Sequence, residues 1–318
     1  MKRTGILIIF LLSASLSLQA QDADSLLLGD ELDFLLTGDS ASIFSLIDSL
    51  LNAEPPKSTS QFAARLGYNS NVLAAGRTLG IENFGLSSGL SYYHTSGIFA
   101  DVSGFWSKDF DPTYYLTIAS VGYSHFFNKY FSLITSYDRY FYNTNNQDAY
   151  IPYRNSFTVS PMFDVKILTT SLAYSYYFGD KQVHRLTPSI GLTLQKKNVG
   201  PFTRISLLPS FLVLFGNESF TESEILVPQT RREAFQNLRT YGKVFPVIET
   251  TRNEFGMMNY TLAIPLSVSI KKTTIGITYA YNVPKALPGE TLTISESSFL
   301  SANLSYFFDF RSHKKPLQ

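Results

Sequence analysis

The chain lacks cysteine altogether, carries few charged residues, and has no apolar run long enough to cross a bilayer as a helix. Without cysteine it has neither a disulfide framework nor an N-terminal cysteine to which a lipid could be attached. Charged residues make up 16% of the 318 positions, against about 25% in ordinary soluble domains. A membrane-spanning helix needs about 20 consecutive apolar residues. The fold itself must therefore hold this chain in its place.

The first twenty residues have the pattern of a secretory signal peptide. Lys2 and Arg3 precede an apolar run from Ile6 to Leu12, and small residues follow as far as Ala20. The run is too short for a membrane anchor, so we expect export with cleavage after Ala20. Removal of residues 1–20 leaves 26 − 2 = 24 basic residues against 25 acidic ones, a formal charge of −1. Such a balance offers no electrostatic footprint for nucleic acid, so we expect no nucleic-acid partner.

Aromatic residues are abundant, with 20 Tyr and 26 Phe. An exported, apolar chain without spanning helices is typical of a membrane β-barrel, in which lipid-facing and lumen-facing residues alternate along each strand. Residues 260–270 show the alternation, because their larger apolar side chains fall on every second position: Tyr260, Leu262, Ile264, Leu266, Val268 and Ile270. Small, mostly polar residues lie between them. A soluble β-sandwich would also alternate, but its outer face would carry Lys, Glu and Arg.

Twelve segments follow this period, so we predict an all-β fold, a transmembrane antiparallel up-and-down β-barrel over residues 61–310. The segments are 61–71, 84–94, 98–108, 114–127, 131–142, 153–165, 167–178, 184–195, 203–215, 255–270, 273–283 and 299–310. Short and longer connections alternate between them; residues 196–202 are expected to be one of the short turns. In barrels with periplasmic termini the short turns are periplasmic and the longer loops external.

The last predicted strand resembles the C-terminal targeting strand of outer-membrane barrels. Its apolar positions alternate with polar ones: Leu300, Ala302, Leu304, Tyr306, Phe308 and Phe310. The resemblance implies an outer-membrane location, contact with outer-membrane lipid, and the barrel assembly machinery as a partner. A tail, residues 311–318, extends beyond the usual terminal Phe. The chain as a whole is similar to uncharacterised barrels of the Bacteroidota, a resemblance that implies no particular activity.

Four predicted strands contain proline in their interiors: Pro161, Pro188, Pro209 and Pro265. Proline cannot donate to the ladder of backbone hydrogen bonds, so each should lie at a bulge or a local break. Curvature of the wall would explain these breaks. A lateral opening for a hydrophobic substrate is the functional alternative.

Residues 21–60 form a separate, acidic segment before the barrel. Eight acidic residues and no Lys or Arg lie between Asp22 and Glu54. The spacing predicts a helix whose apolar stripe is Ile43, Phe44, Leu46, Ile47, Leu50 and Leu51. Such a stripe must pack on something, so residues 21–56 should dock in the lumen as a plug, on the periplasmic rim, or on a periplasmic or outer-membrane partner protein. Pro55 and Pro56 then end the helical segment.

A connection of 39 residues, 216–254, separates two predicted strands, and loops of this length are usually functional or disordered. Residues 230–241 can form a short helix. Its basic residues, with the lysine that follows, are candidates for a constriction or a lid: Arg231, Arg232, Arg239 and Lys243. Folded inward they would line a narrow point of the lumen; folded outward they would form an external surface. The spacing does not decide between these two.

Nothing in the sequence predicts an enzyme, a cofactor or a metal site. His94-Thr95-Ser96-Gly97 resembles the His-x-Ser-Asn-Gly stretch of outer-membrane phospholipases but lacks the Asn, so lipid hydrolysis is only a minor alternative. If the alternation holds, six charged residues line the lumen: Arg65, Asp101, Asp164, Arg185, Lys271 and Asp309. We therefore expect a narrow pore or gated carrier for a small solute. The alternatives are a non-conducting accessory barrel that binds a partner, and hydrophobic-substrate uptake with an N-terminal hatch.

Overall fold

The computed structural model describes residues 60–70, 85–108, 110–143, 153–288, 290 and 295–309. The predicted signal peptide, the acidic segment with its stripe from Ile43 to Leu51, and the tail at 311–318 lie outside these residues. Among the described residues, no helix has both the length and the apolar character that would be needed to cross a membrane.

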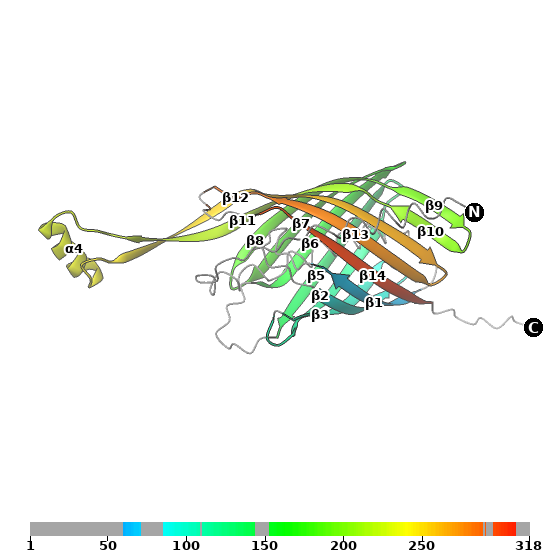
Figure 1. The fold of residues 1–318 in the computed structure, drawn as a ribbon, viewed down its shortest axis with the longest axis horizontal. Helices are drawn as coiled ribbons and strands as arrows, with labels where there is room; N and C mark the ends of the chain where they lie inside the picture. Colours follow the sequence, from blue (N-terminus) through cyan, green and yellow to red (C-terminus); the bar gives the residue numbers. More distant parts are fainter. Residues whose placement is uncertain are drawn as a thin grey trace, which may run out of the picture. The chain divides into compact units, whose positions relative to one another are not determined.

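The described chain consists of strands and one helix (Figure 1). The elements are β1 (Gln61–Asn69), β2 (Gly85–Tyr93), β3 (Ile98–Ser107), β4 (Tyr114–Phe126), β5 (Phe131–Tyr142), β6 (Tyr153–Val165), β7 (Leu168–Gly179), β8 (Gln182–Leu192), β9 (Leu194–Val199), β10 (Phe202–Leu207), β11 (Ser210–Ile225), α4 (Arg231–Tyr241), β12 (Val247–Ile270), β13 (Thr273–Pro284) and β14 (Ser297–Asp309).

The wall is a closed, twelve-stranded antiparallel barrel, as predicted. Each strand pairs with its neighbour in sequence, and the ring closes where β1 pairs with β14. The fourteen strand segments make twelve wall strands because β8 and β9 run on as one strand, and so do β10 and β11. The pairing registers show this continuity, since Gly191 lies opposite Ser210 and Leu194 lies opposite Leu207. The wall therefore has no open edge.

The two ends of the barrel differ in their connections. We call the end at which β1 begins and β14 ends the terminal end, and the opposite one the loop end. Tight turns close the terminal end, and residues with positive φ lie in them or directly beside them: Gly97, Lys166, Asn198, Gly200 and Lys271. At Gly97, where φ is 92°, a Cβ atom would lie 2.1 Å from the carbonyl oxygen of Ser124. Only glycine fits at this point of the β2–β3 turn.

Residues 196–202, predicted as a turn, are mostly strand, which corrects that prediction. β9 and β10 pair from Leu194–Leu207 to Val199–Phe202, so the turn itself is confined to residues 200–201. Every residue from Leu194 to Asn198 is exposed. Because these residues are exposed, they do not have to alternate between apolar and polar. The predicted strand, 184–195, therefore ends before the observed one, which continues to Val199.

The connection predicted at 216–254 is also largely strand. β11 pairs with β8 only as far as Gly216, and β12 pairs with β13 only from Asn259. Between these points and the pair Ile225–Val247, β11 and β12 pair with each other alone. They form a two-stranded ribbon, residues 217–225 and 247–258, which is about 30 Å long at 3.4 Å per residue. Figure 1 shows this ribbon continuing beyond the wall strands to α4.

The helix predicted at 230–241 is confirmed as α4, and its ends are capped. The Thr230 hydroxyl accepts a hydrogen bond of 3.2 Å from the backbone N–H of Glu233. At the other end Gly242 takes the left-handed conformation, and its N–H donates to the carbonyl of Leu238 at 3.0 Å. Capping satisfies backbone groups that a short helix would otherwise expose. None of the residues of α4 is buried.

A buried ion pair joins the base of the ribbon to the wall. Arg185 on β8 donates from Nη2 to Glu218 Oε2 on β11 over 3.0 Å, and both side chains are more than nine-tenths buried. Arg185 Nη1 also donates to the carbonyl of Asn217. Gly216 makes room for this contact, since a Cβ atom there would lie 2.6 Å from the Arg185 side chain. The first residues of the ribbon are thereby fixed to the barrel.

Each interior proline coincides with missing rungs in the ladder on one side of its strand. The β6–β7 pairing skips Ser160 and Pro161, and the β8–β11 pairing skips Thr187 and Pro188. Pro209 separates β10 from β11, opposite the skipped residues Ile264 and Pro265 on β12. The prediction that these prolines lie at local breaks is confirmed.

We predict that Glu218→Ala destabilises the barrel by about 3–5 kcal/mol, because the charge of Arg185 would remain buried without its carboxylate. Guanidinium unfolding in lipid vesicles, followed by the fluorescence of the single tryptophan, Trp106, measures the change. The double substitution Arg185→Met with Glu218→Leu removes both charges and should recover most of the loss. A loss below about 0.5 kcal/mol for Glu218→Ala, the range of ordinary surface substitutions, would contradict the assignment.

Candidate functional site

The outward face of the wall is an apolar band bounded by aromatic residues. Exposed aliphatic side chains occupy its middle, among them Leu90, Val102, Val121, Leu172, Ile190 and Leu262. Exposed aromatic residues lie toward the terminal end, namely Phe62, Tyr123, Phe127, Tyr130, Phe163, Tyr306 and Phe308. Others lie toward the loop end, namely Tyr68, Tyr137, Phe141, Tyr174 and Tyr279. An apolar belt between two aromatic girdles is the outer surface of membrane barrels. The barrel is therefore of the outer-membrane type.

The inward face is lined by small hydroxyl residues that bond across neighbouring strands. Thr158 and Ser175 lie 2.9 Å apart, Ser171 and Ser189 2.6 Å, and Ser269 and Thr274 3.0 Å, each distance joining the two hydroxyl oxygens. These pairs join β6 to β7, β7 to β8, and β12 to β13. Since β-strand side chains alternate between faces, every second residue of each strand belongs to the same inner surface. The inner surface therefore presents hydroxyl groups, which can exchange their hydrogen bonds to one another for hydrogen bonds to water or solute.

An ion pair lies within this hydroxyl lining, on β1 and β3. Arg65 contacts the carboxylate of Asp101 through Nη2 and also donates from Nη2 to Ser103 Oγ at 3.1 Å. Asp101 accepts two further hydrogen bonds, from Ser91 at 2.6 Å and from Ser103 at 2.8 Å. Gly89 lies between the two strands, and a Cβ there would come within 3.2 Å of Arg65 Nη2. The charges of Arg65 and Asp101 offset each other.

Two inward carboxylates are held by hydroxyl groups instead of a cation. Asp138 on β5 accepts a hydrogen bond of 2.9 Å from Ser156, whose oxygen also lies 3.1 Å from the hydroxyl of Tyr140. Asp164 on β6 accepts one of 2.6 Å from Thr169. Within the described ranges, no ion pair involves either carboxylate. They are the negative charges of the inner wall that no described cation offsets.

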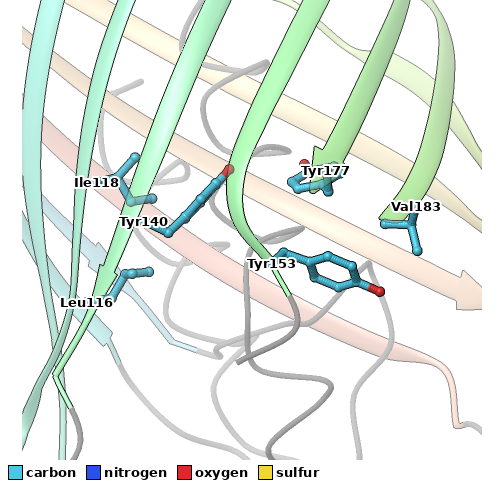
Figure 2. Packing of buried hydrophobic residues seen from close by; sticks show 6 residues of the cluster. All are labelled: Leu116, Ile118, Tyr140, Tyr153, Tyr177 and Val183. Atoms are coloured by element: carbon cyan, nitrogen blue, oxygen red, sulfur yellow. The ribbon is translucent and has the colours of Figure 1, made fainter. Parts of the chain in front are cut away.

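A cluster of bulky residues interrupts the hydroxyl lining in the loop-end half of the barrel. This aromatic cluster comprises Leu116, Ile118, Tyr140, Tyr153, Tyr177 and Val183, all of them buried. Figure 2 shows their side chains on neighbouring strands, from β4 to β8. Alternation places them on the inward face, where they take up cross-section that serine and threonine leave open. The inner wall therefore has a hydroxyl-lined part and an apolar part.

Four of the six predicted lumen residues lie on the inward face: Arg65, Asp101, Asp164 and Arg185. Lys271 lies in the exposed β12–β13 turn, not on the wall. Asp309 is the last residue of β14 and pairs with Gln61; its side chain is not among those that the structure describes. The sequence reading missed Asp138, although the alternation of Ser136, Asp138 and Tyr140 marks it. Glu218 was not predicted either, because residues 216–254 were predicted to be a loop and form strand up to Ile225.

The four basic candidates for a constriction or lid lie on α4 and just after it. Arg231, Arg232 and Arg239 belong to the helix, and Lys243 follows its cap. All four are exposed, and they lie beyond the last pair of the ribbon, Ile225–Val247. These residues therefore lie at the far end of the ribbon that extends from the wall. They do not line a narrow point of the lumen, which was the inward alternative.

The His94-Thr95-Ser96-Gly97 segment forms the exposed β2–β3 turn. His94 Nδ1 lies 2.8 Å from Ser96 Oγ and also accepts the backbone N–H of Ser96 at 3.2 Å. These contacts are local to the turn, and no described carboxylate is hydrogen-bonded to the imidazole, so the third group of a hydrolytic arrangement is not in evidence. The described residues include no group of three or more His, Asp and Glu side chains that could hold a metal ion.

No protein-family model matches the chain, and no curated protein matches it. Solved structures that are similar include the KdgM porin, at 11% identity over 78% of this chain and 99% of that one, with a TM-score of 0.43. The NanC porin is 14% identical over 77% of this chain and 98% of that one, with a TM-score of 0.40. An outer membrane channel from Pseudomonas putida F1 is 11% identical over 81% and 98%, with a TM-score of 0.44.

Proposed function

We propose that the barrel is a narrow pore or gated carrier for small polar solutes. The observation that carries this proposal is the inward lining of Ser and Thr hydroxyls, which runs over neighbouring strands around the wall. A structural barrel has no need for it, because apolar residues of matching size fill a closed interior more stably. Twelve strands also lie between the eight of a side-chain-filled barrel and the sixteen of an open porin.

The charges of the inner wall favour cations over anions. Arg65 and Arg185 are each paired with a carboxylate, so neither contributes a net positive charge. Asp138 and Asp164 have no described cation beside them. Fixed charges in a narrow, low-dielectric passage act more strongly on permeating ions than exposed rim charges, which salt screens. A modest preference for cations follows.

The aromatic cluster narrows the range of solutes. Its rings and aliphatic side chains offer an apolar face, while Tyr140 and Ser156 next to it offer hydroxyl groups. A solute with both an apolar face and several hydrogen-bonding groups would fit this wall better than a bare ion. We infer that such molecules are the cargo.

Asp138→Asn should lower the cation-to-anion permeability ratio about two- to fivefold, since one fixed charge is lost from a confined passage. The reversal potential of the refolded protein in a planar bilayer, under a KCl gradient, measures the ratio. Asp180→Asn is the matched control, because Asp180 is half-exposed at the loop end and 3.8 Å from Arg154. Silent membranes under all conditions, or an unchanged ratio in Asp138→Asn, would refute the pore or its selectivity, respectively.

A second candidate function, docking of an acidic segment, is favoured by the charge of the terminal end. The described turns and strand ends there carry seven basic residues, against two acidic ones, the inward Asp164 and Asp309 at the end of β14: Lys129, Lys166, Lys196, Lys197, Arg204, Lys271 and Lys272. We infer that this basic rim holds the predicted helix at residues 39–54, whose charged residues are Asp39, Asp48 and Glu54. The chain enters β1 at this same end.

Because the chain has no native cysteine, paired cysteine substitutions test this docking in the full-length protein. Asp48→Cys with Lys197→Cys should form a disulfide on mild oxidation, seen as a shift in gel mobility. Asp48→Cys with Lys285→Cys, at the loop end, is the control and should not. Cross-linking of Asp48→Cys to Asp138→Cys instead would mean that the segment lies in the lumen as a plug.

Uptake of a hydrophobic molecule through the wall is the third candidate. The missing rungs beside Pro161 and Pro188 favour it, since they interrupt the β6–β7 and β8–β11 pairings, which lie on either side of the strand pair β7–β8. Each gap spans only two residues per strand. It would have to widen to pass a substrate, with residues 21–60 as its hatch.

A further inference from the structure

Arg139 on β5 is a charged side chain on the outward face of the wall. Its neighbours in the strand, Asp138 and Tyr140, point inward, so alternation places Arg139 on the outward face. It lies opposite Ala119 on β4 and Asn155 on β6. A charge on this face is costly at the middle of the bilayer and inexpensive near its surface. Its position along the strand therefore matters.

Arg139 lies at the level of the loop-end aromatic girdle. The outward residues of β5 run from Phe131 at the terminal end through Tyr137 and Arg139 to Phe141. Eight residues separate Phe131 from Arg139, a rise of about 20 Å for a strand tilted by about 40°. The apolar band of a membrane barrel is about 25 Å tall. Arg139 therefore lies near the loop-end edge of the band, about 5 Å below it, and its long side chain can reach the headgroups of the loop-end leaflet.

The surrounding side chains hold the guanidinium group in place without neutralising it. Arg139 Nη1 donates to Asn155 Oδ1 at 2.7 Å, and the hydroxyl of Tyr137 donates to the same oxygen, also at 2.7 Å. The Cζ atom of Arg139 lies 5.7 Å from the centre of the Phe141 ring. Asn155 is itself largely buried. This is an oriented, uncharged setting for a cation.

The remaining donors of Arg139 have no acidic partner within the described structure. An arginine has five N–H donors in a planar fork, and the bond to Asn155 uses one of them. The nearby Arg154 is paired with Asp180, so that carboxylate is already engaged. Planar guanidinium groups bind phosphate oxygens through two parallel hydrogen bonds. The remaining N–H groups of Arg139 could form such a pair of bonds.

We propose that Arg139, held by Asn155 and Tyr137, binds a phosphate group on the headgroup of a lipid in the loop-end leaflet. Phe141 and Tyr137 flank the site and would pack against the apolar part of the same lipid. A guanidinium group that only reached toward water would need no acceptor to orient it. The hydrogen bond from Arg139 to Asn155 Oδ1 holds the guanidinium group against the wall, where a bound lipid would lie, and the bond from Tyr137 to the same oxygen holds Asn155 in place.

Native mass spectrometry of the full-length protein in detergent tests this site. The probes are diphosphorylated lipid A, the same glycolipid with its phosphates removed, and inorganic phosphate. The wild-type protein should retain the phosphorylated lipid preferentially. Arg139→Ala should bind it about tenfold more weakly, while both proteins should bind the phosphate-free lipid equally. Arg139→Lys should be intermediate, because it keeps the charge without the planar fork.

The matched control is Arg231→Ala, which removes the same charge from exposed α4 and should leave lipid binding unchanged. Folding of each variant is checked by its gel mobility before and after heating; if Arg139→Ala does not fold, Arg139→Gln, which can still donate to Asn155, replaces it. Equal retention of the phosphorylated lipid by wild type and variant would overturn the proposal. So would displacement of the lipid by millimolar inorganic phosphate, because the ligand would then be the free ion.

Discussion

The structure depends on one constraint: inside hydrocarbon, every backbone N–H and C=O must find its partner within the chain. Closure through the β1–β14 pairing satisfies it, because no strand of the wall is left with an open edge. The interior prolines interrupt the ladder only locally. There the bonds of the strand to its other neighbour persist, and Leu208 and Leu192 donate to the carbonyls of Pro265 and Pro209 over 2.9 Å.

The same constraint made the wall predictable from sequence. A strand between lipid and a polar interior has to change character at every residue, so the period of two in segments such as Thr273–Pro284 appears directly in the order of amino acids. The twelve wall strands and most of the inward charges followed from that period. The helix at Arg231–Tyr241 followed from local signals instead, a threonine cap and a closing glycine.

Where lipid does not impose the alternation, the sequence lost its predictive value. The hairpin residues Leu194–Asn198 are all exposed, and the ribbon beyond Gly216 leaves the wall, so neither segment has to alternate strictly between apolar and polar residues. Glu218 was missed for this reason. The aromatic cluster was missed for another: Tyr140, Tyr153 and Tyr177 suit either face of a membrane strand, and only the register shows that they point inward.

The inward charges also help to determine the register between neighbouring strands. A slip of one residue between neighbouring strands would turn every side chain of a strand to the opposite face. For β1 or β8 this would move Arg65 or Arg185 from a paired position in the interior into lipid. An arginine near the middle of the bilayer costs about 2–4 kcal/mol, and its carboxylate would lose its partner as well. The ion pairs therefore disfavour the slipped registers, whereas the hydroxyl residues, which tolerate either neighbour, leave the interior adaptable. Arg139 fits the same logic, since the correct register puts it near the edge of the apolar band, where a charge on the outer face is inexpensive.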